Sequence, residues 1–173
     1  MNLLLPIAFL LMAQAGPTQP KGQIIGQIPA DMIAVKNLTI GSLRSRVLSV
    51  LGKPSRSRRG YDSDMGMGKW EEMHFPGLVV EVTKPEPTSV NPGQKEAHVW
   101  RMIITGKGWS TKCGLRIGQT REQAISALGQ PASEESKGTA TVLHYFPKVF
   151  DGFLWVELRN DIVTEIGVAE DWT

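Results

Sequence analysis

The chain has 173 residues, of which 41% are hydrophobic and 21% are charged, and its formal net charge is +2. This length and composition suit one compact domain or two small ones, and they exclude an intrinsically disordered chain. A charge balance so close to zero gives no reason to expect nucleic acid or an anionic membrane as the main partner.

The first 15 residues have the pattern of a secretory signal peptide. The apolar run from Leu3 to Met12 is too short to span a bilayer comfortably, and the small residues of Ala13-Gln14-Ala15 follow it and suit signal peptidase. No Lys or Arg precedes the run, so only the α-amino group is positively charged there. We predict residues 1–15 as a signal peptide cleaved near Ala15 and residues 16–33 as a linker. The mature protein is then periplasmic or secreted.

Cys113 is the single cysteine, so the chain forms no intramolecular disulfide. It lies far from the predicted cleavage point, which leaves no cysteine there for a lipid anchor. We interpret Cys113 as buried filler, because no motif places a histidine or an aspartate beside it; a metal ligand and a nucleophile are the alternatives.

An internal repeat is the main indication of the fold. The segment from Leu38 to Pro54 matches the segment from Leu115 to Pro131 without a gap, and both contain Leu, Ile, Gly, Arg, Ser, Leu, Gly and Pro in register. The spacing is too long for a solenoid and suits a duplicated small domain. We therefore predict a first repeat over residues 34–110 and a second over residues 111–173.

Each copy opens with a predicted short amphipathic helix. Ser42 and Thr120 suit the N-cap region, while Gly52 and Gly129 suit the left-handed position that ends a helix. A proline two residues later prevents either helix from continuing. The matching apolar faces are Val47, Leu48, Val50 and Leu51 in the first copy, and Ala124, Ile125, Ala127 and Leu128 in the second.

Three strand-like segments follow each helix. They cover 70–75, 78–83 and 98–105 in the first copy, and 139–146, 153–158 and 162–169 in the second. We align the two copies on Phe75-Pro76 and Phe146-Pro147. The predicted fold class is α+β: two tandem repeats, each a short helix (or helix pair) packed on an antiparallel three-stranded meander, together forming an open sheet.

The Ile-Gly before each helix, the Leu-Gly-x-Pro after it and the following meander resemble two families. One is the SmpA/OmlA-like small lipoprotein of the outer-membrane β-barrel assembly machine, and the other is β-lactamase inhibitory protein. The resemblance covers about Leu38 to Trp172 and implies that the sheet face opposite the helices binds a protein partner. The chain departs from the lipoproteins in lacking their cysteine, and its polar loop from Lys84 to Ala97 is longer than the matching turn at Asn160-Asp161.

Strand alternation predicts which side chains face away from the helices. The predicted partner-binding residues are Trp70, Glu72, His74, Glu81, Arg101, Tyr145, Phe153, Trp155 and Glu157, and Val79, Leu143 and Glu165 share their face. Aromatic residues and arginine among polar groups are typical of protein-binding hot spots. Two other interpretations stay open: a tail, loop or second copy covers these side chains, or a register error of one residue moves them into the core.

We therefore predict an exported, non-enzymatic protein-binding module of the bacterial cell envelope, whose partner is an envelope protein or a secreted enzyme. We expect no catalytic residue, cofactor, metal, nucleic-acid partner or stable membrane anchor. One alternative is a secreted enzyme inhibitor of the β-lactamase inhibitory protein type, and another is a small metal-dependent hydrolase using Glu72 and His74. Arg56, Arg58 and Arg59 form a basic cluster in the predicted loop after the first helix, either solvated or in contact with anionic lipid or envelope polymer.

Overall fold

A computed structural model describes residues 26–63, 66–85, 95–148 and 151–171. The predicted signal peptide, its cleavage site and residues 16–25 of the predicted linker lie outside the described residues, as does most of the long polar loop. Among the described residues, no helix has the length and apolar composition needed to cross a membrane.

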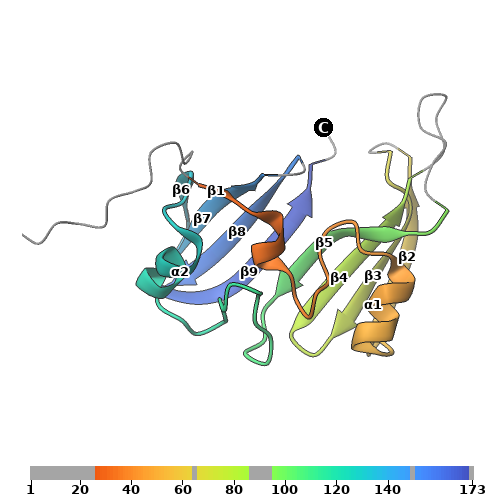
Figure 1. The fold of residues 1–173 in the computed structure, drawn as a ribbon, viewed down its shortest axis with the longest axis horizontal. Coiled ribbons are helices and arrows are strands. Elements are labelled where there is room, and N and C mark those ends of the chain that lie inside the picture. The colour runs from red at the N-terminus through yellow and green to blue at the C-terminus, as the bar shows by residue number, and fades with distance from the viewer. Residues whose placement is uncertain (1–25, 64–65, 86–94, 149–150, 172–173) are drawn as a thin grey trace, which may run out of the picture.

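Within the described part of the chain, the strands form one nine-stranded sheet (Figure 1). They are β1 (Gln27–Ile28), β2 (Arg56–Asp62), β3 (Gly68–Phe75), β4 (Leu78–Lys84), β5 (His98–Ile104), β6 (Ser133–Lys137), β7 (Ala140–Pro147), β8 (Gly152–Arg159) and β9 (Ile162–Glu170). The order across the sheet is β1-β7-β8-β9-β5-β4-β3-β2, with β6 also paired to β7. The sheet is mixed, because β1 runs parallel to β7 while the other pairs are antiparallel.

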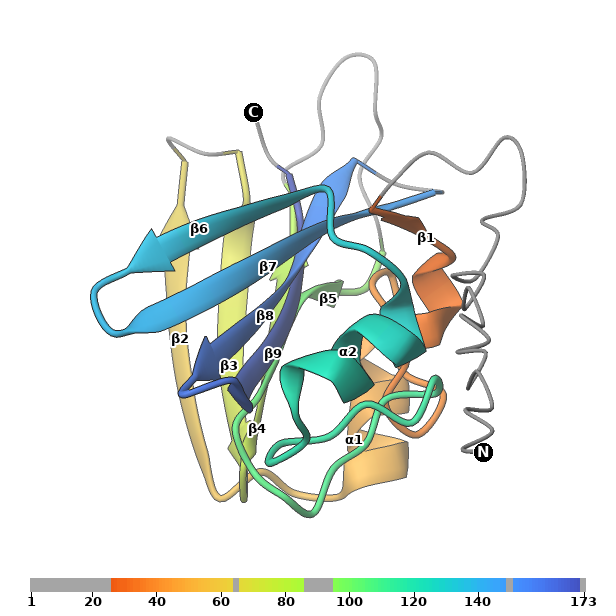
Figure 2. The same cartoon turned by 90° about the vertical axis from the view of Figure 1, so that its left-hand side faces the viewer.

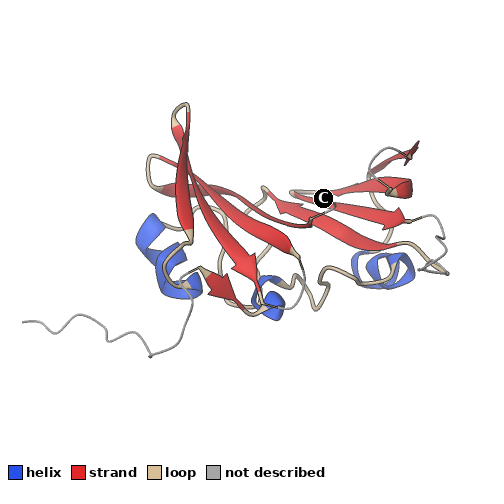
Figure 3. Ribbon diagram, turned by 90° about the horizontal axis from the view of Figure 1, so that it is seen from above, coloured by secondary structure: helices blue, strands red, loops and turns tan. Residues whose placement is uncertain are grey.

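The three short helices of the described residues lie on one side of this sheet (Figure 3): the 3₁₀ helix η1 (Ala30–Ile33), α1 (Arg44–Leu51) and α2 (Arg121–Leu128). A capping box begins α2, because the Thr120 hydroxyl accepts from the amide of Gln123 and the Gln123 side chain accepts from the amide of Thr120. The predicted glycine ends are confirmed, since Gly52 and Gly129 follow the two α-helices with φ of 78° and 85°.

The predicted fold class is wrong. The chain is mostly β, and its sheet is one continuous mixed sheet instead of two helix-on-meander units. Sequence reasoning missed β2 and β6, whose sequences Arg-Ser-Arg-Arg-Gly-Tyr-Asp and Ser-Glu-Glu-Ser-Lys are almost entirely polar. Such strands lack the apolar alternation that marks a half-buried strand, because they lie at the margins of the sheet and are largely exposed.

Part of the predicted linker belongs to the core. Ile28 on β1 and Ile33 on η1 are only 2% and 3% exposed, and β1 pairs with the end of β7. The segment from Gly26 to Val35 is mostly apolar, but it shows neither a clear alternation nor a helical period by which this packing could have been predicted. Residues 26–33 are therefore part of the folded unit.

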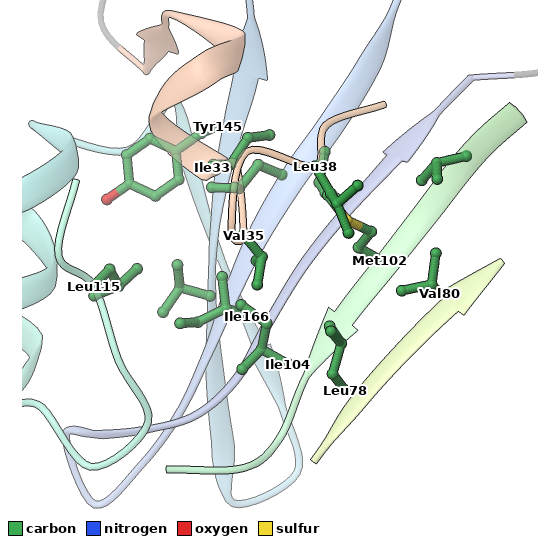
Figure 4. Close-up of a cluster of buried hydrophobic side chains, with 14 of the residues drawn as sticks. Ile33, Val35, Leu38, Leu78, Val80, Met102, Ile104, Leu115, Tyr145 and Ile166 are labelled. Atoms are coloured by element: carbon green, nitrogen blue, oxygen red, sulfur yellow. The ribbon is translucent and has the colours of Figure 1, made fainter. Parts of the chain in front are cut away.

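A single hydrophobic core lies between the helices and the sheet. Figure 4 shows Ile33, Val35 and Leu38 from the N-terminal segment among side chains from both parts of the sheet, including Met102 and Ile166. The antiparallel pairing of β5 with β9 joins the first half of the sheet (β2–β5) to the second half (β6–β9). The core and the sheet are thus continuous across the two predicted repeats.

Candidate functional site: the open face of the sheet

The candidate site is the sheet face opposite the helices, which we call the open face. In Figure 3 all three helices lie on the other side of the sheet. Figures 2 and 3 show the β6–β7 hairpin projecting on the open side at one end of the sheet. Among the described residues, no helix covers the open face.

Eight of the nine predicted binding residues lie on the open face: Trp70, Glu72, His74, Glu81, Arg101, Phe153, Trp155 and Glu157. Their neighbours along each strand, such as Met73, Val80 and Val156, are fully buried in the core. Glu165, placed beside them by the same alternation, lies directly opposite Glu157. The predicted alternation is therefore correct for β3, β4 and β8.

Tyr145 is the exception, and its predicted place was wrong. Its side chain is fully buried beside the core, it pairs across the sheet with Leu154, and its hydroxyl donates to the carbonyl of Gly129 at 3.1 Å. Burial raises the pKa of Tyr145 to about 12. Leu143, also predicted outward, is buried for the same reason.

A one-residue misalignment explains this error. The alignment on the Phe-Pro pairs matched Tyr145 with His74, whereas the register matches His144 with His74: His74 lies opposite Val79 and His144 lies opposite Trp155. A longer connection between β7 and β8 than between β3 and β4 takes up the difference. Since side chains alternate with a period of two, a shift of one residue exchanges the two faces.

Charged side chains occupy the first half of the open face. His74 Nε2 lies 2.6 Å from Glu72 Oε1, and Arg58 Nη1 lies 3.9 Å from the same oxygen. Glu72 stands opposite Glu81, whose carboxylate accepts from Arg101 Nη1 at 3.2 Å. The Glu81 side chain is only 14% exposed, and burial raises the pKa of this carboxyl, with Glu72 adding to the shift while Arg101 opposes it.

An aromatic cluster adjoins these charges in the second half. The guanidinium of Arg101 lies 5.7 Å from the centre of the Trp155 ring, within the range of a cation–π contact. The rings of Phe153 and Trp155 have centroids 5.7 Å apart, and the Trp155 indole donates to Glu165 Oε1 at 2.7 Å. Arg101 thus links Glu81 on β4 to Trp155 on β8, across the junction of the two halves.

Two glycines make room for the indole rings of this face. A Cβ at Gly167 on β9 would overlap the ring of Trp155, and a Cβ at Gly60 on β2 would overlap the ring of Trp70. Each indole therefore lies over the backbone of the neighbouring strand. A side chain at either glycine would displace the ring, so the two glycines are needed for this packing.

Sequence reasoning did not assign Trp100, which lies between the buried Val99 and Arg101 of the open face. Trp100 is the extra residue of a β-bulge, because Glu81 pairs with Arg101 while Val82 pairs with Val99. Strict alternation fails at such a bulge, and the buried indole nitrogen of Trp100 has no hydrogen-bond partner among the residues that the structure describes. A bulge leaves no local sequence signal by which Trp100 could have been assigned.

His144 and the basic cluster were also placed differently. His144, which was not among the predicted binding residues, lies on the open face with Nε2 3.3 Å from Glu135 Oε2. An alignment of the two halves on their histidines would have found it. The basic cluster is in strand β2 and not in a loop: Arg58 lies opposite Glu72 on the open face, whereas Arg59 contacts Glu71 on the helix side.

Within the described ranges, no three or more His, Cys, Asp and Glu side chains are grouped so as to hold a metal ion. Cys113 is half-buried at the margin of the core, less buried than predicted, and its Sγ lies 3.0 Å from Thr111 Oγ1.

Comparison with models of known protein families finds no match, and no curated protein sequence matches either. Among solved structures, the chain is similar to an extracellular protein containing an SCP domain from Bacillus anthracis, with 15% identity, a TM-score of 0.44 and 88% of this chain covered. The present chain covers only 50% of the length of that protein. It is also similar to a DUF4309 family protein from Bacillus subtilis, with 13% identity, a TM-score of 0.42, and 79% of this chain and 84% of that one covered.

Proposed function

We propose that the protein is an exported, non-enzymatic protein-binding module that docks a protein partner through the open face. Export is supported by the signal-peptide pattern of residues 1–15. The partner is then an envelope protein or a secreted enzyme. The observation that carries the proposal is the Glu81–Arg101–Trp155–Phe153 cluster, in which partly exposed charged and aromatic side chains hold one another in place.

The arrangement of this cluster suits binding. Trp and Arg are the residue types that most often dominate binding free energies, and they do so where surrounding contacts exclude water. Arg101 is held by Glu81, and Trp155 is held by Glu165 and by its position over Gly167. Side chains that are already ordered lose little conformational entropy when a partner docks.

The curvature of the open side supports the same use. The β6–β7 hairpin projects past the open face at one end (Figure 2), and Val142 on β7 is only 6% exposed although it lies opposite Glu157 on that face. A partner that docks on Trp155 would therefore meet the hairpin at its side. Such a surface favours a convex partner over a flat one.

Site-specific photo-cross-linking tests the proposal. A photoreactive residue would replace Phe153, which is 39% exposed on the open face, or Ser126, which is exposed on α2 as the matched control on the helix side. Cross-linking in intact cells and in the medium should give a discrete product with the Phe153 variant alone. The product should disappear in a folded Trp70→Ala/Trp155→Ala background. A partner captured equally from position 126 would place the interface elsewhere.

A further inference from the structure

A second candidate surface lies at the β2 end of the sheet. Strand β2 pairs with β3 on one side only, and no strand of the described residues pairs with its other edge. Most of its side chains are exposed, from Arg56 to Arg59 and at Tyr61. A long exposed edge presents unpaired backbone N–H and C=O groups, which is a template for an added strand.

The positive charge of the β2 edge disfavours pairing with the same edge of a second molecule and favours pairing with an acidic strand. Arg58 extends on the open face and Arg59 on the helix side, and Arg56 begins the strand. Arginines on an edge repel the same edge of a second molecule, which is how natural sheets avoid pairing with themselves. The same charges attract glutamate or aspartate on an incoming strand.

A cavity of about 560 Å³ lies beside this edge on the helix side, between α1 and β2. It is lined by Arg44, Leu48, Gly52, Lys53, Pro54, Ser55, Arg56, Ser57, Arg59 and Glu71. Four of these side chains are cationic and one is anionic. The cavity therefore has an excess of positive charge next to an unpaired strand edge.

Glu71 neutralises only part of the positive charge of the cavity. Its carboxylate accepts from Arg44 Nε at 2.6 Å and from Arg59 Nη2 at 3.1 Å. Burial would raise the pKa of Glu71, but the hydrogen bonds and charges of the two arginines outweigh burial and lower it. Glu71 is the one carboxylate among the residues lining the cavity, and its hydrogen bonds go to Arg44 and Arg59, so the lining holds no second carboxylate for Lys53 and Arg56.

We propose that the β2 edge and this cavity bind an extended acidic segment of a protein partner, which adds to the sheet as a strand beside β2. Side chains of an added strand alternate between the two faces. One set enters the cavity near Lys53 and Arg59, and the other lies beside Arg58 on the open face. An anionic lipid surface would use the same arginines but would leave the strand edge unpaired, so the edge favours a peptide. This site is separate from the Trp155 cluster and does not rest on it.

Fluorescence anisotropy with a synthetic probe tests the proposal. The probe is a labelled peptide of about eight alternating glutamate and valine residues, long enough to span β2. The controls are the same peptide with every backbone amide N-methylated, which has no N–H to pair along either edge, and a glutamine–valine peptide. Wild-type protein should bind only the first peptide. The double variant Lys53→Glu/Arg58→Glu should bind it at least ten-fold more weakly, and Arg116→Glu, an exposed charge reversal elsewhere, should bind it as wild type does.

Three results would overturn the proposal. The first is no binding of the glutamate–valine peptide by wild type at millimolar concentration. The second is equal binding of the N-methylated peptide, or binding of phosphatidylglycerol vesicles in preference to the peptide, which would assign the arginines to a charged surface alone. The third is self-association that Glu135→Lys abolishes, because the acidic strand β6 of a second copy would then be the occupant.

Discussion

At matching register positions, the two halves of the open face carry different charges. In the first half Glu81 lies opposite Arg101, and in the second half Glu157 lies opposite Glu165. Each pair stands next to a β-bulge, so the backbone is alike at the two places. The same backbone position therefore holds an ion pair in the first half and two carboxylates in the second.

Donors around the second pair compensate for its like charges. Arg159 Nε donates to Glu157 Oε1 at 3.0 Å, and Trp155 Nε1 donates to Glu165 Oε1 at 2.7 Å. Arg101 of the first half then lies over the ring of Trp155. The charged–aromatic cluster is thus built from both halves, and it exists only because β5 pairs with β9.

The largest change in the free energy of unfolding is expected at Tyr145, the residue whose register in the second half was mispredicted. Tyr145 and Phe75 hold matching buried positions, opposite Leu154 and Leu78. Tyr145→Ala should lower the free energy of unfolding by about 3–5 kcal/mol, because it leaves a cavity and removes a hydrogen bond. Urea denaturation measures this, with Tyr61→Ala, at a 58% exposed site, expected within about 0.5 kcal/mol of wild type. A loss below about 1 kcal/mol would place the Tyr145 ring outside the core.

The two halves also differ on the helix side of the sheet, where Glu71 in the first half matches Thr141 in the second. Glu71→Gln should cost about 1.5–3 kcal/mol at pH 7, since it removes the charge that Arg44 and Arg59 hydrogen-bond. The pKa of Glu71 is lowered in the folded state, so its stabilisation is present above the ordinary value of 4.5 and is lost as pH falls through the folded pKa. Unfolding curves at pH 7 and pH 3 measure the difference, which should shrink at pH 3. An unchanged difference would contradict the account.

The two indole–glycine contacts provide the next test. Gly167→Val should destabilise the fold by about 1–3 kcal/mol, because the new side chain displaces the ring of Trp155. Gly60→Val should cost less, since Gly60 is half-buried on the edge strand β2 and a Cβ there would lie 2.4 Å from the nearest ring atom of Trp70, against 1.9 Å between Gly167 and Trp155. Thermal unfolding of both variants measures the order. The reverse order would show that Trp70 is the more firmly held ring.

The smallest change in stability is expected at Glu81, whose pKa is shifted in the opposite direction to that of Glu71. Its folded pKa is raised, chiefly by burial, so the folded state loses stability as pH rises from the ordinary 4.5 through the folded value. Glu81→Gln should therefore be more stable than wild type at pH 7, by no more than about 1 kcal/mol, with no difference at pH 3. Paired denaturation curves at the two values test this. A variant less stable than wild type at pH 7 would mean that the contact with Arg101 outweighs burial.

Local signals were enough to predict some of this structure. The Leu-Gly-x-Pro ends of α1 and α2 and the apolar alternation of β4 and β8 depend on nearby residues alone, and the structure has these elements where they were predicted. Most of the open face followed from that alternation. The polar edge strands β2 and β6 and the bulge at Trp100 have no such local signal.

The contacts that make the candidate site depend on distant pairing. Arg101 reaches Trp155 because the last strand of each half pairs with the other, and no motif in either strand indicates that pairing. The burial of residues in the segment 26–33 also depends on distant pairing, because Ile28 is buried where β1 pairs with the end of β7. Tyr145 shows how a correct strand assignment still fails when the register is wrong by one residue.

The central claim is that the junction of the two halves on the open face docks a protein partner. The most direct test is the affinity of the cross-linked partner, once purified, measured by titration calorimetry with wild type, Trp155→Ala and the helix-side control Ser126→Ala. Folded Trp155→Ala should bind the partner at least ten-fold more weakly than wild type, and Ser126→Ala should bind it as wild type does. Equal affinities for all three proteins would contradict it and remove the open face as the docking surface.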